Sequence, residues 1–225
     1  MRINEIAARG FSSAAEVYER ARPGYAPAAV GWLCERLGLG VGRVVLDLGA
    51  GTGKLTRDLV PSGARVIAVE PLHEMRAHLV EAVPEAEALA GMAEAIPLAD
   101  ESMDAVVCGQ AFHWFDPERA LPEIHRVLRP GGALGLIWNT TWTERHDDVL
   151  SVSPLFGAVE SRKWPSEQRV SLEGLCDVVA SRSYVANLDA SAREELLGHI
   201  RATFADAEEP LVLRYVVEVF VADRA

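Results

Sequence analysis

The sequence predicts an α/β fold with a doubly wound, mostly parallel β-sheet. Apolar segments at 44–48, 65–70, 104–108 and 133–138 have the length of strands, and segments with helical periodicity lie between them. Strands that alternate with helices are typical of a parallel sheet, because each crossover back to the same edge needs a helix-sized connection. The chain has 225 residues, 49% of them hydrophobic, so we expect one substantial core and one domain over 1–225.

Composition argues against several kinds of partner and location. The formal net charge of −11 disfavours a nucleic-acid partner, because such binding depends on lysine and arginine side chains that neutralise phosphates. Cys34, Cys108 and Cys176 are odd in number and lie among apolar neighbours, so we expect reduced thiols, a cytoplasmic protein and no metal site. No apolar stretch has the length of a signal peptide or a membrane span, so we expect no membrane association; the oligomeric state is left open.

Two helices are predicted in residues 1–40, before the first strand. The first, at 13–22, ends where Pro23 disfavours helical geometry in the preceding residue. The second follows Pro27, has apolar residues at helical spacing, and ends near Gly38.

The clearest motif is a glycine-rich loop between the first strand and the next helix. Gly49, Gly51 and Gly53 follow Asp47 at alternate positions, and an amphipathic segment begins directly afterwards. Glycine adopts positive φ without strain and has no Cβ to obstruct a ligand, and the free N–H groups at a helix start favour an anion. The loop therefore predicts a ligand site, since an ordinary strand-to-helix turn seldom needs three glycines in five residues.

The spacing of this loop argues against two common nucleotide sites. A phosphate-binding loop ends in Gly-Lys followed by serine or threonine, but Lys54 is followed by Leu55. The dinucleotide fingerprint G-x-G-x-x-G would require a glycine where Lys54 stands. An NAD(P)-dependent oxidoreductase is therefore kept only as an alternative.

An acid ends the second predicted strand. Because parallel strands finish at one edge of the sheet, Glu70 is placed to accept both hydroxyls of a ribose, as the corresponding acid does in dinucleotide-binding folds. The alternative is a solvated acid at a strand end.

Three segments carry a resemblance to a known family. The strand and loop at 44–53 resemble motif I, D/E-x-G-x-G-x-G, of the class I S-adenosylmethionine-dependent methyltransferases. Residues 91–109 are similar to that family's pattern G-x-A-E-x-[IL]-P-[LF]-x-D-x-S-x-D-x-[VI], and Leu-Arg-Pro-Gly-Gly at 128–132 is similar to its link into the fifth strand. A fourth segment, residues 18–25, looks like the leader of many small-molecule methyltransferases, so the resemblance covers 18–139. It implies a seven-stranded Rossmann-like sheet with an antiparallel last strand, S-adenosylmethionine as the cofactor, and an N-terminal region over 1–40 that folds over it.

The same resemblance implies the cofactor contacts. The loop backbone would run under the methionine part, with Asp47 near its amino group. Met75 would pack near the adenine, and Ala93 and Glu94 would read the adenine edge. The expected cofactor-binding residues are Asp47, Gly49, Ala50, Gly51, Thr52, Gly53, Glu70, Pro71, Met75, Ala93, Glu94 and Gln110.

The acceptor side is predicted at 110–116, Gln-Ala-Phe-His-Trp-Phe-Asp, which follows the fourth strand where open α/β sheets place ligands. This segment resembles the trans-aconitate methyltransferases and related small-molecule enzymes, which implies a small carboxylic acid, phenol or carbon acid as acceptor. His113 is a candidate catalytic base or substrate anchor, because a histidine pKa can lie near neutrality; the alternative is a histidine that packs under Trp114.

The candidate substrate residues come from both halves of the chain. Aromatic residues near the N-terminus can bind a substrate or simply pack, and an arginine can bind a carboxylate or simply lie on the surface. The expected substrate residues are Tyr18, Tyr25, His113, Trp114, Arg182 and Tyr184.

The C-terminal half is expected to supply substrate-side elements over 140–210. A separate turn at 116–120 and a helix from Leu121 precede it, because Pro122 suggests a helix start. A helix capped by Ser171, with Leu172, Leu175, Cys176 and Val179 inward, follows a sixth strand within 156–170. Ser191 and Glu194 form a capping box for a helix with Leu196, Leu197, Ile200 and Phe204 inward, and apolar residues at alternate positions of 211–222 predict an antiparallel strand.

One departure from the family pattern concerns 140–153, which is shorter than the helical stretch that similar enzymes carry between their fifth and sixth strands. A second alternative function follows, a non-catalytic protein that binds S-adenosylmethionine. Such a protein would lack an enclosed second pocket facing 110–114, whereas an oxidoreductase would bind NADH in place of S-adenosylmethionine.

Overall fold

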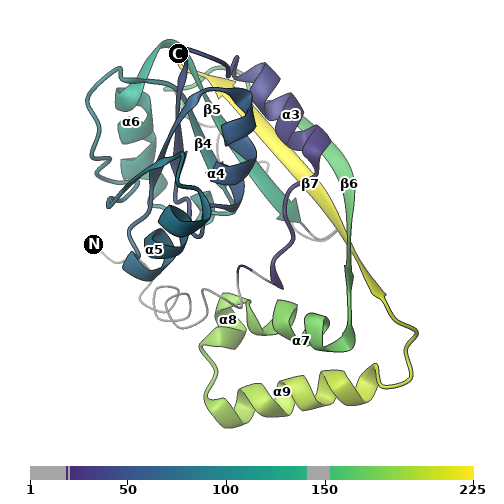
Figure 1. The fold of residues 1–225 in the computed structure, drawn as a ribbon. Helices are drawn as coiled ribbons and strands as arrows, with labels where there is room; N and C mark the ends of the chain where they lie inside the picture. Colours follow the sequence, from purple (N-terminus) through teal and green to yellow (C-terminus); the bar gives the residue numbers. More distant parts are fainter. Residues whose placement is uncertain (1–18, 20, 141–152) are drawn as a thin grey trace. The chain divides into compact units, whose positions relative to one another are not determined.

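The computed structural model describes residue 19 and residues 21–140 and 153–225 (Figure 1). These residues form two compact units. The first, here called the sheet unit, comprises the described parts of Gly24–Ser166 together with Val216–Ala225. The second, the helical unit, comprises the described parts of Met1–Pro23 together with Glu167–Tyr215. The expectation of a single domain over 1–225 stays a prediction.

Seven strands form one sheet in the order β3-β2-β1-β4-β5-β7-β6. The strands from β3 to β5 pair in parallel, whereas β7 runs antiparallel to β5, with Phe220 opposite Leu136. This confirms the predicted doubly wound sheet with an antiparallel last strand. The strands are β1 Val44–Leu48, β2 Arg65–Val69, β3 Glu87–Leu89, β4 Met103–Gly109, β5 Leu128–Thr140, β6 Glu160–Val170 and β7 Leu211–Asp223.

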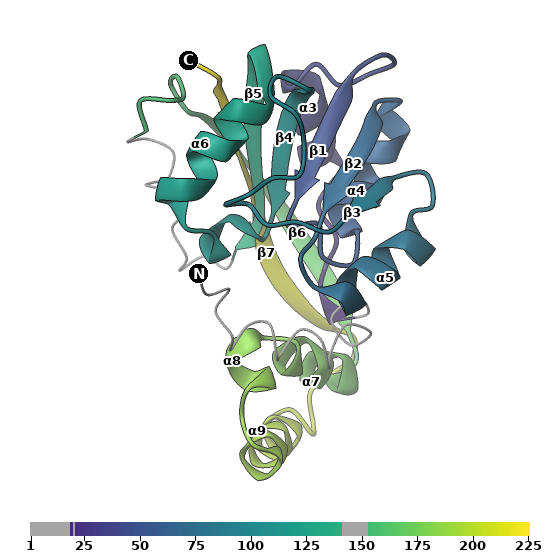
Figure 2. The same cartoon turned by 90° about the vertical axis from the view of Figure 1, so that its left-hand side faces the viewer.

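Helices cover both faces of the sheet (Figures 1 and 2). On one face, Leu46 and Leu48 of β1 pack in a core with Ile124 of α6; on the other, Val45 packs with Leu33 of α3 and with α4. Side chains alternate along a strand, so Asp47 shares the face of Val45 and α4. The helices of this unit are α3 Pro27–Arg36, α4 Lys54–Leu59, η1 Val60–Ser62, α5 His73–Ala82, η2 Phe112–Trp114 and α6 Pro117–Val127.

The expected separate turn at 116–120 is wrong, because α6 begins at Pro117. The Asp116 side chain caps the helix by accepting a hydrogen bond from the Glu118 N–H, and Pro117 is suited to the first helical position. Pro122 lies inside the helix, where it removes a single backbone hydrogen bond without ending the element.

The helical unit contains α7 Leu172–Ala180, α8 Ser183–Ala186 and α9 Ala190–Thr203. Ser171 caps α7 as predicted, but of the four residues expected inward only Cys176 is buried, together with Val178; Leu172, Leu175 and Val179 are half-buried. The predicted capping box of Ser191 and Glu194 is wrong, since Asp189 caps α9 by accepting from the Ala192 N–H, which starts the helix before Ser191. Phe204 was expected to face inward but is 41% exposed, because it follows the last turn of α9.

Two predicted segments fall mostly on residues that the structure does not describe. Almost all of the predicted helix at 13–22, and almost all of the short segment at 140–153, lie outside the described residues. Cys34, Cys108 and Cys176 are free thiols, and burial raises the pKa of Cys108 well above its usual range. Among the described residues, no helix combines the length and the apolar character that crossing a membrane requires.

Candidate functional site

The predicted ligand-binding segments meet at one edge of the sheet unit. β1 pairs in parallel with β2 on one side and with β4 on the other, so the three strands end side by side. The glycine loop follows β1, Glu70 follows β2, and residues 110–116 follow β4. Ligands of open α/β sheets bind at such an edge, where the strand order changes direction.

The glycine loop has the backbone that the sequence predicts. Gly49, Gly51 and Gly53 have φ values of 74°, 58° and 90°. A Cβ on Gly49 would lie 2.7 Å from that of Ala111, and one on Gly53 would lie 3.1 Å from the Leu79 side chain. Apart from its two neighbours in sequence, a Cβ on Gly51 would meet no atom of the described residues within 4 Å. Gly49 and Gly53 are therefore needed for close packing, whereas Gly51 borders open space.

Glu70 is a fixed, nearly buried carboxylate, which contradicts the alternative of a solvated strand-end acid. It is 6% exposed, and its Oε2 and Oε1 atoms accept hydrogen bonds of 2.9 Å from the N–H groups of Gly51 and Leu72. Burial raises the pKa of Glu70, although these two bonds and the charge of Arg76 oppose the rise. Each oxygen can still accept a second hydrogen bond, because a carboxylate oxygen has two lone pairs.

Asp47 is fully buried directly before the loop. Its Oδ2 accepts a 2.6 Å hydrogen bond from the Thr56 hydroxyl of α4. Its Oδ1 is buried with no hydrogen-bond partner among the described residues. Burial raises the pKa of Asp47 to about 7; the Thr56 bond opposes this rise and the charge of Glu70 adds to it. An unpaired buried acceptor is costly, so a ligand that donates to Oδ1 would relieve a penalty.

The segment 91–100 forms the third side of this edge. Ala93 is buried, and Met75 of α5 is also buried. The Glu94 carboxylate accepts a 2.9 Å hydrogen bond from the Asp116 N–H. Sequence reasoning gave Glu94 a role toward the adenine alone, and the structure adds a bond that joins this segment to the start of α6.

The segment after β4 is tightly organised. Gln110 has a φ of 55°, its N–H donates to the Ile137 carbonyl, and its side-chain amide donates to the Asn139 carbonyl at 2.8 Å. A residue other than glycine in this left-handed region is strained, and such residues cluster at functional sites. Within η2, His113 is exposed, and its ring centroid lies 4.7 Å from that of Trp114.

Tyr25 also reaches this edge of the sheet unit. Its hydroxyl approaches Gly109 so closely that a Cβ there would lie 2.6 Å away. The Asn139 side-chain amide donates to the Gly24 carbonyl at 3.1 Å and so anchors the residue before Tyr25. The structure therefore brings Tyr25 to the same edge as His113 and Trp114.

The other candidate substrate residues belong to the helical unit or lie outside the described residues. Arg182 and Tyr184 belong to the helical unit, where Tyr184 is 67% exposed. Tyr18 lies outside the described residues. Within the helical unit, Arg22 donates to the Ser181 carbonyl, and the nearly buried Tyr215 hydroxyl donates to Gln168.

Two residues of this edge were missed by sequence reasoning. Thr56 binds Asp47 and Asn139 binds Gly24, across 9 and 115 residues of sequence. Neither residue belongs to a recognisable motif, so only the packing of α4 on β1 and the ends of β5 and α3 could identify them.

Comparison with known proteins gives one family. The methyltransferase domain model matches residues 46–136. An uncharacterized methyltransferase of Mycobacterium tuberculosis is 43% identical over 211 residues, which cover 87% of this chain and 85% of the relative. A malonyl-[acyl-carrier protein] O-methyltransferase of Methylococcus capsulatus is 43% identical over 96 residues, 40% of this chain and 35% of that one.

A solved structure has the same fold at low sequence identity. The phosphoethanolamine N-methyltransferase 2 of Haemonchus contortus, in complex with S-adenosyl-L-methionine, superposes with a TM-score of 0.61 at 15% identity, covering 100% of this chain and 60% of the other. At this identity the similarity concerns the fold alone.

Proposed function

The chain belongs to the class I S-adenosylmethionine-dependent methyltransferases, and we propose that it methylates a small organic acceptor, namely a carboxylic acid, a phenol or a carbon acid. The observation that carries this proposal is the edge of the sheet unit where Gly51 borders open space between Glu70 and the segment that bears His113. The family membership argues against the nicotinamide-dependent alternative.

The residues at this edge fit S-adenosylmethionine. The open space beside Gly51 leaves room for the methionine part along the loop backbone. Oδ1 of Asp47 is an acceptor that a ligand ammonium group would satisfy, and Glu70 presents carboxylate oxygens suited to ribose hydroxyls. Ala93, Glu94 and the neighbouring backbone would read the adenine. When bound, the cofactor supplies a methyl group activated by a sulfonium.

The protein's contribution to the reaction is then mainly orientation. Methyl transfer is a single displacement, so the acceptor must lie in line with the sulfur–methyl bond and water must be kept out. Positioning alone can supply about 7–11 kcal/mol of the barrier. His113, exposed beside Trp114 after β4, is the candidate to bind the acceptor or to take its proton. Tyr25 is a further candidate contact at this edge.

The acceptor class rests on composition and on one relative. A net charge of −11 disfavours a polyanion as substrate. The Methylococcus capsulatus relative is named as a malonyl-[acyl-carrier protein] O-methyltransferase, and a malonyl group carries a carboxylic acid, one of the acceptor types that the resemblance of 110–116 implies. Arg182 in the helical unit remains a proposed partner for such a carboxylate.

A screen with methyl-labelled S-adenosylmethionine tests the acceptor class. Panels of small carboxylic acids, phenols and carbon acids are incubated with the protein, and Gly51→Val is the control. We expect label in an organic product of one panel with the wild type and none with the variant. Label that appears only in protein or nucleic acid would contradict the proposal, and binding of the cofactor without transfer to any acceptor would favour the non-catalytic alternative.

Glu70→Ala is expected to weaken S-adenosylhomocysteine binding by about 1–3 kcal/mol, because charge-assisted hydrogen bonds to the ribose are lost. Calorimetry with S-adenosylhomocysteine and its 2′-deoxy analogue separates this effect from a disturbed loop, since Glu70 also holds the Gly51 N–H. The wild type should bind the deoxy analogue more weakly, whereas the variant should bind both ligands alike. An equal preference for the hydroxyl in both proteins would show that Glu70 acts through the loop instead.

Asp47→Asn is expected to stabilise the unliganded protein above pH 7 while weakening the cofactor. Because the pKa of Asp47 is raised by folding to about 7 from an ordinary value of 3.8, its contribution to stability falls as the pH rises from about 4 to 7. Above pH 7, the ionised Asp47 therefore lowers the free energy of unfolding by about 4 kcal/mol. Asparagine can still accept the Thr56 bond but carries no charge to meet an ammonium group.

Thermal unfolding of the wild type and Asp47→Asn at pH 5 and pH 8, combined with calorimetry, checks this. The stability gain of the variant should be larger at pH 8. Near pH 6 the wild type should release a proton when S-adenosylhomocysteine binds, which appears as a heat that depends on the buffer. A variant with unchanged affinity and the same proton release would exclude Asp47 from the cofactor site.

A further inference from the structure

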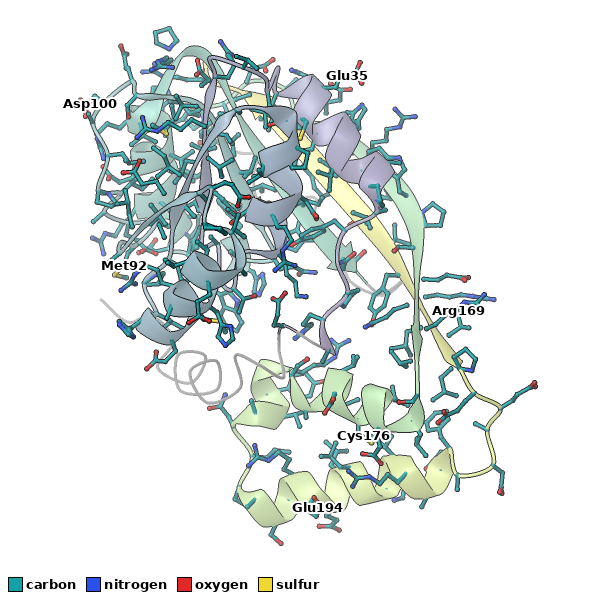
Figure 3. The ribbon with its side chains drawn as sticks, viewed as in Figure 1. Glu35, Met92, Asp100, Arg169, Cys176 and Glu194 are labelled. Carbon is teal, nitrogen blue, oxygen red and sulfur yellow. The ribbon has the colours of Figure 1, made fainter. Side chains whose placement is uncertain are left out.

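One helix holds the segment that the proposed function places against the adenine. Residues 91–100, here called the adenine loop, have no regular secondary structure beyond a bridge between Met92 and Ala95. Met92 and Asp100, both labelled in Figure 3, mark its two ends. The shape of such a segment is set by side-chain contacts and not by a backbone ladder, so the groups that hold it decide what it can recognise.

Arg126 of α6 makes several of these contacts. Its Nη2 donates to the Ile96 carbonyl at 3.0 Å, and its Nη1 donates to the Leu98 carbonyl at 2.9 Å and to the Asp100 carboxylate at 2.7 Å. The other side of its guanidinium forms a bidentate pair with Glu123, with distances of 2.7 and 2.8 Å. One planar group therefore joins three successive points of the adenine loop to α6.

Glu123 completes this arrangement. Its Oε2 accepts a 2.8 Å hydrogen bond from the Ile96 N–H, so both backbone groups of Ile96 are bound by the Arg126–Glu123 pair. At the other end of the loop, the Glu94 carboxylate accepts from the Asp116 N–H at the start of α6. The side chain of Ile96 is also buried in the core. The loop is thus fastened to both ends of one helix.

We propose that Arg126, together with Glu123, is a positioning residue that sets the selectivity of the cofactor site for adenine. The inference rests on the proposed function, in which Ala93 and Glu94 read the adenine edge. A backbone that recognises the 6-amino group of adenine discriminates only if its acceptors are held in place, because a mobile loop can turn a donor toward a 6-oxo group equally well. Arg126 binds the backbone of the same loop at Ile96 and Leu98, two and four residues after Glu94.

The geometry of the contact makes arginine necessary. The guanidinium is a rigid planar fork with five N–H donors, and here it serves two carbonyls and two carboxylates at once. A lysine carries one ammonium with three donors and cannot reproduce this set. The pair is also partly exposed, at 29% for Arg126 and 24% for Glu123, so its removal should leave the global fold intact. A change in ligand selectivity without unfolding is therefore the expected result.

The test compares S-adenosylhomocysteine with S-inosylhomocysteine, which has a 6-oxo group in place of the 6-amino group. Calorimetry is done on the wild type, Arg126→Gln, Arg126→Lys and the control Arg119→Gln. Arg119 is an exposed arginine on the same helix and has no side-chain hydrogen bond or ion pair among the residues that the structure describes. Glu123→Gln removes the other partner of the Arg126–Glu123 ion pair. If an Arg126 variant unfolds, the affinities of Glu123→Gln for the two ligands replace it in the comparison.

We expect the wild type and Arg119→Gln to prefer S-adenosylhomocysteine. In both Arg126 variants, its affinity should fall about tenfold and the preference over the inosine analogue should fall toward unity, as loss of one fixed hydrogen bond predicts. An unchanged preference for S-adenosylhomocysteine in folded Arg126 and Glu123 variants would overturn the inference. A preference of wild-type size in Arg126→Lys would overturn it as well. A wild type that binds neither ligand would instead overturn the proposed cofactor site.

Discussion

Replacing Gly51 by valine is expected to reduce the affinity for S-adenosylhomocysteine by more than about 100-fold. Two effects combine. A β-branched residue is strongly disfavoured at the observed φ of 58°. Its side chain would also fill the space beside Gly51, which is open among the described residues beyond its sequence neighbours. The first effect alone would distort the loop, whereas the second would exclude the ligand from it. Calorimetric titration of the folded variant measures the loss.

Gly38→Val is the matched control for strain. Gly38 has a φ of 60°, and beyond its sequence neighbours its Cβ position also meets no described atom within 4 Å, but it follows α3 at the opposite end of β1. The two variants should lose similar thermal stability, and only Gly51→Val should lose the ligand. Equal affinities in both variants would place the cofactor elsewhere.

His113→Gln is expected to lower the maximal rate by about 10²–10⁴-fold if His113 is a base, with no change in cofactor affinity. Glutamine retains hydrogen bonding but cannot take a proton near neutral pH, so one ionisation should also disappear from the pH–rate profile. If His113 only anchors the acceptor, the variant should instead raise KM with little change in kcat. Steady-state kinetics on the acceptor found by the labelled screen distinguishes the two roles.

His199→Gln serves as the control, because His199 is an exposed histidine of α9 in the helical unit. It should leave rate, KM and pH profile unchanged. A His113→Gln enzyme with the same three properties as this control would leave only packing against Trp114 for His113.

Much of the sheet unit could be predicted because its signals are local. Apolar runs of strand length predict β1, β2, β4 and β5. The three glycines of the loop predict a backbone with positive φ, and all three have it. Parallel pairing then brings Glu70 and residues 110–116 to the loop without further information.

What could not be predicted depends on partners that are distant in sequence. The sequence around Asp47 does not indicate that the Thr56 hydroxyl donates a hydrogen bond to its carboxylate. Likewise, the sequence around Arg126 does not indicate that its guanidinium hydrogen-bonds to three residues of the adenine loop. The start of α6 is a related case. Pro122 by itself predicts a helix start, whereas the Asp116 cap and Pro117 together begin the helix earlier.

The roles toward the substrate were the least predictable from sequence. His113 and Trp114 come to this edge because they follow β4, and Tyr25, which precedes α3, reaches it through its contact with Gly109. Arg182 and Tyr184 were chosen by residue type alone, and their roles stay predictions. An acceptor is recognised by a few side chains from several segments, and no single stretch of sequence specifies such a set.

A crystal structure of the protein with S-adenosylhomocysteine tests the central claim most directly. The account predicts the amino-acid part of the ligand along 49–53, a ribose hydroxyl within about 3 Å of the Glu70 carboxylate, and the adenine against Ala93 and Glu94. Oδ1 of Asp47 should gain a donor. Ligand density away from the carboxyl ends of β1 and β2, with Gly51 still bordering empty space, would contradict the account.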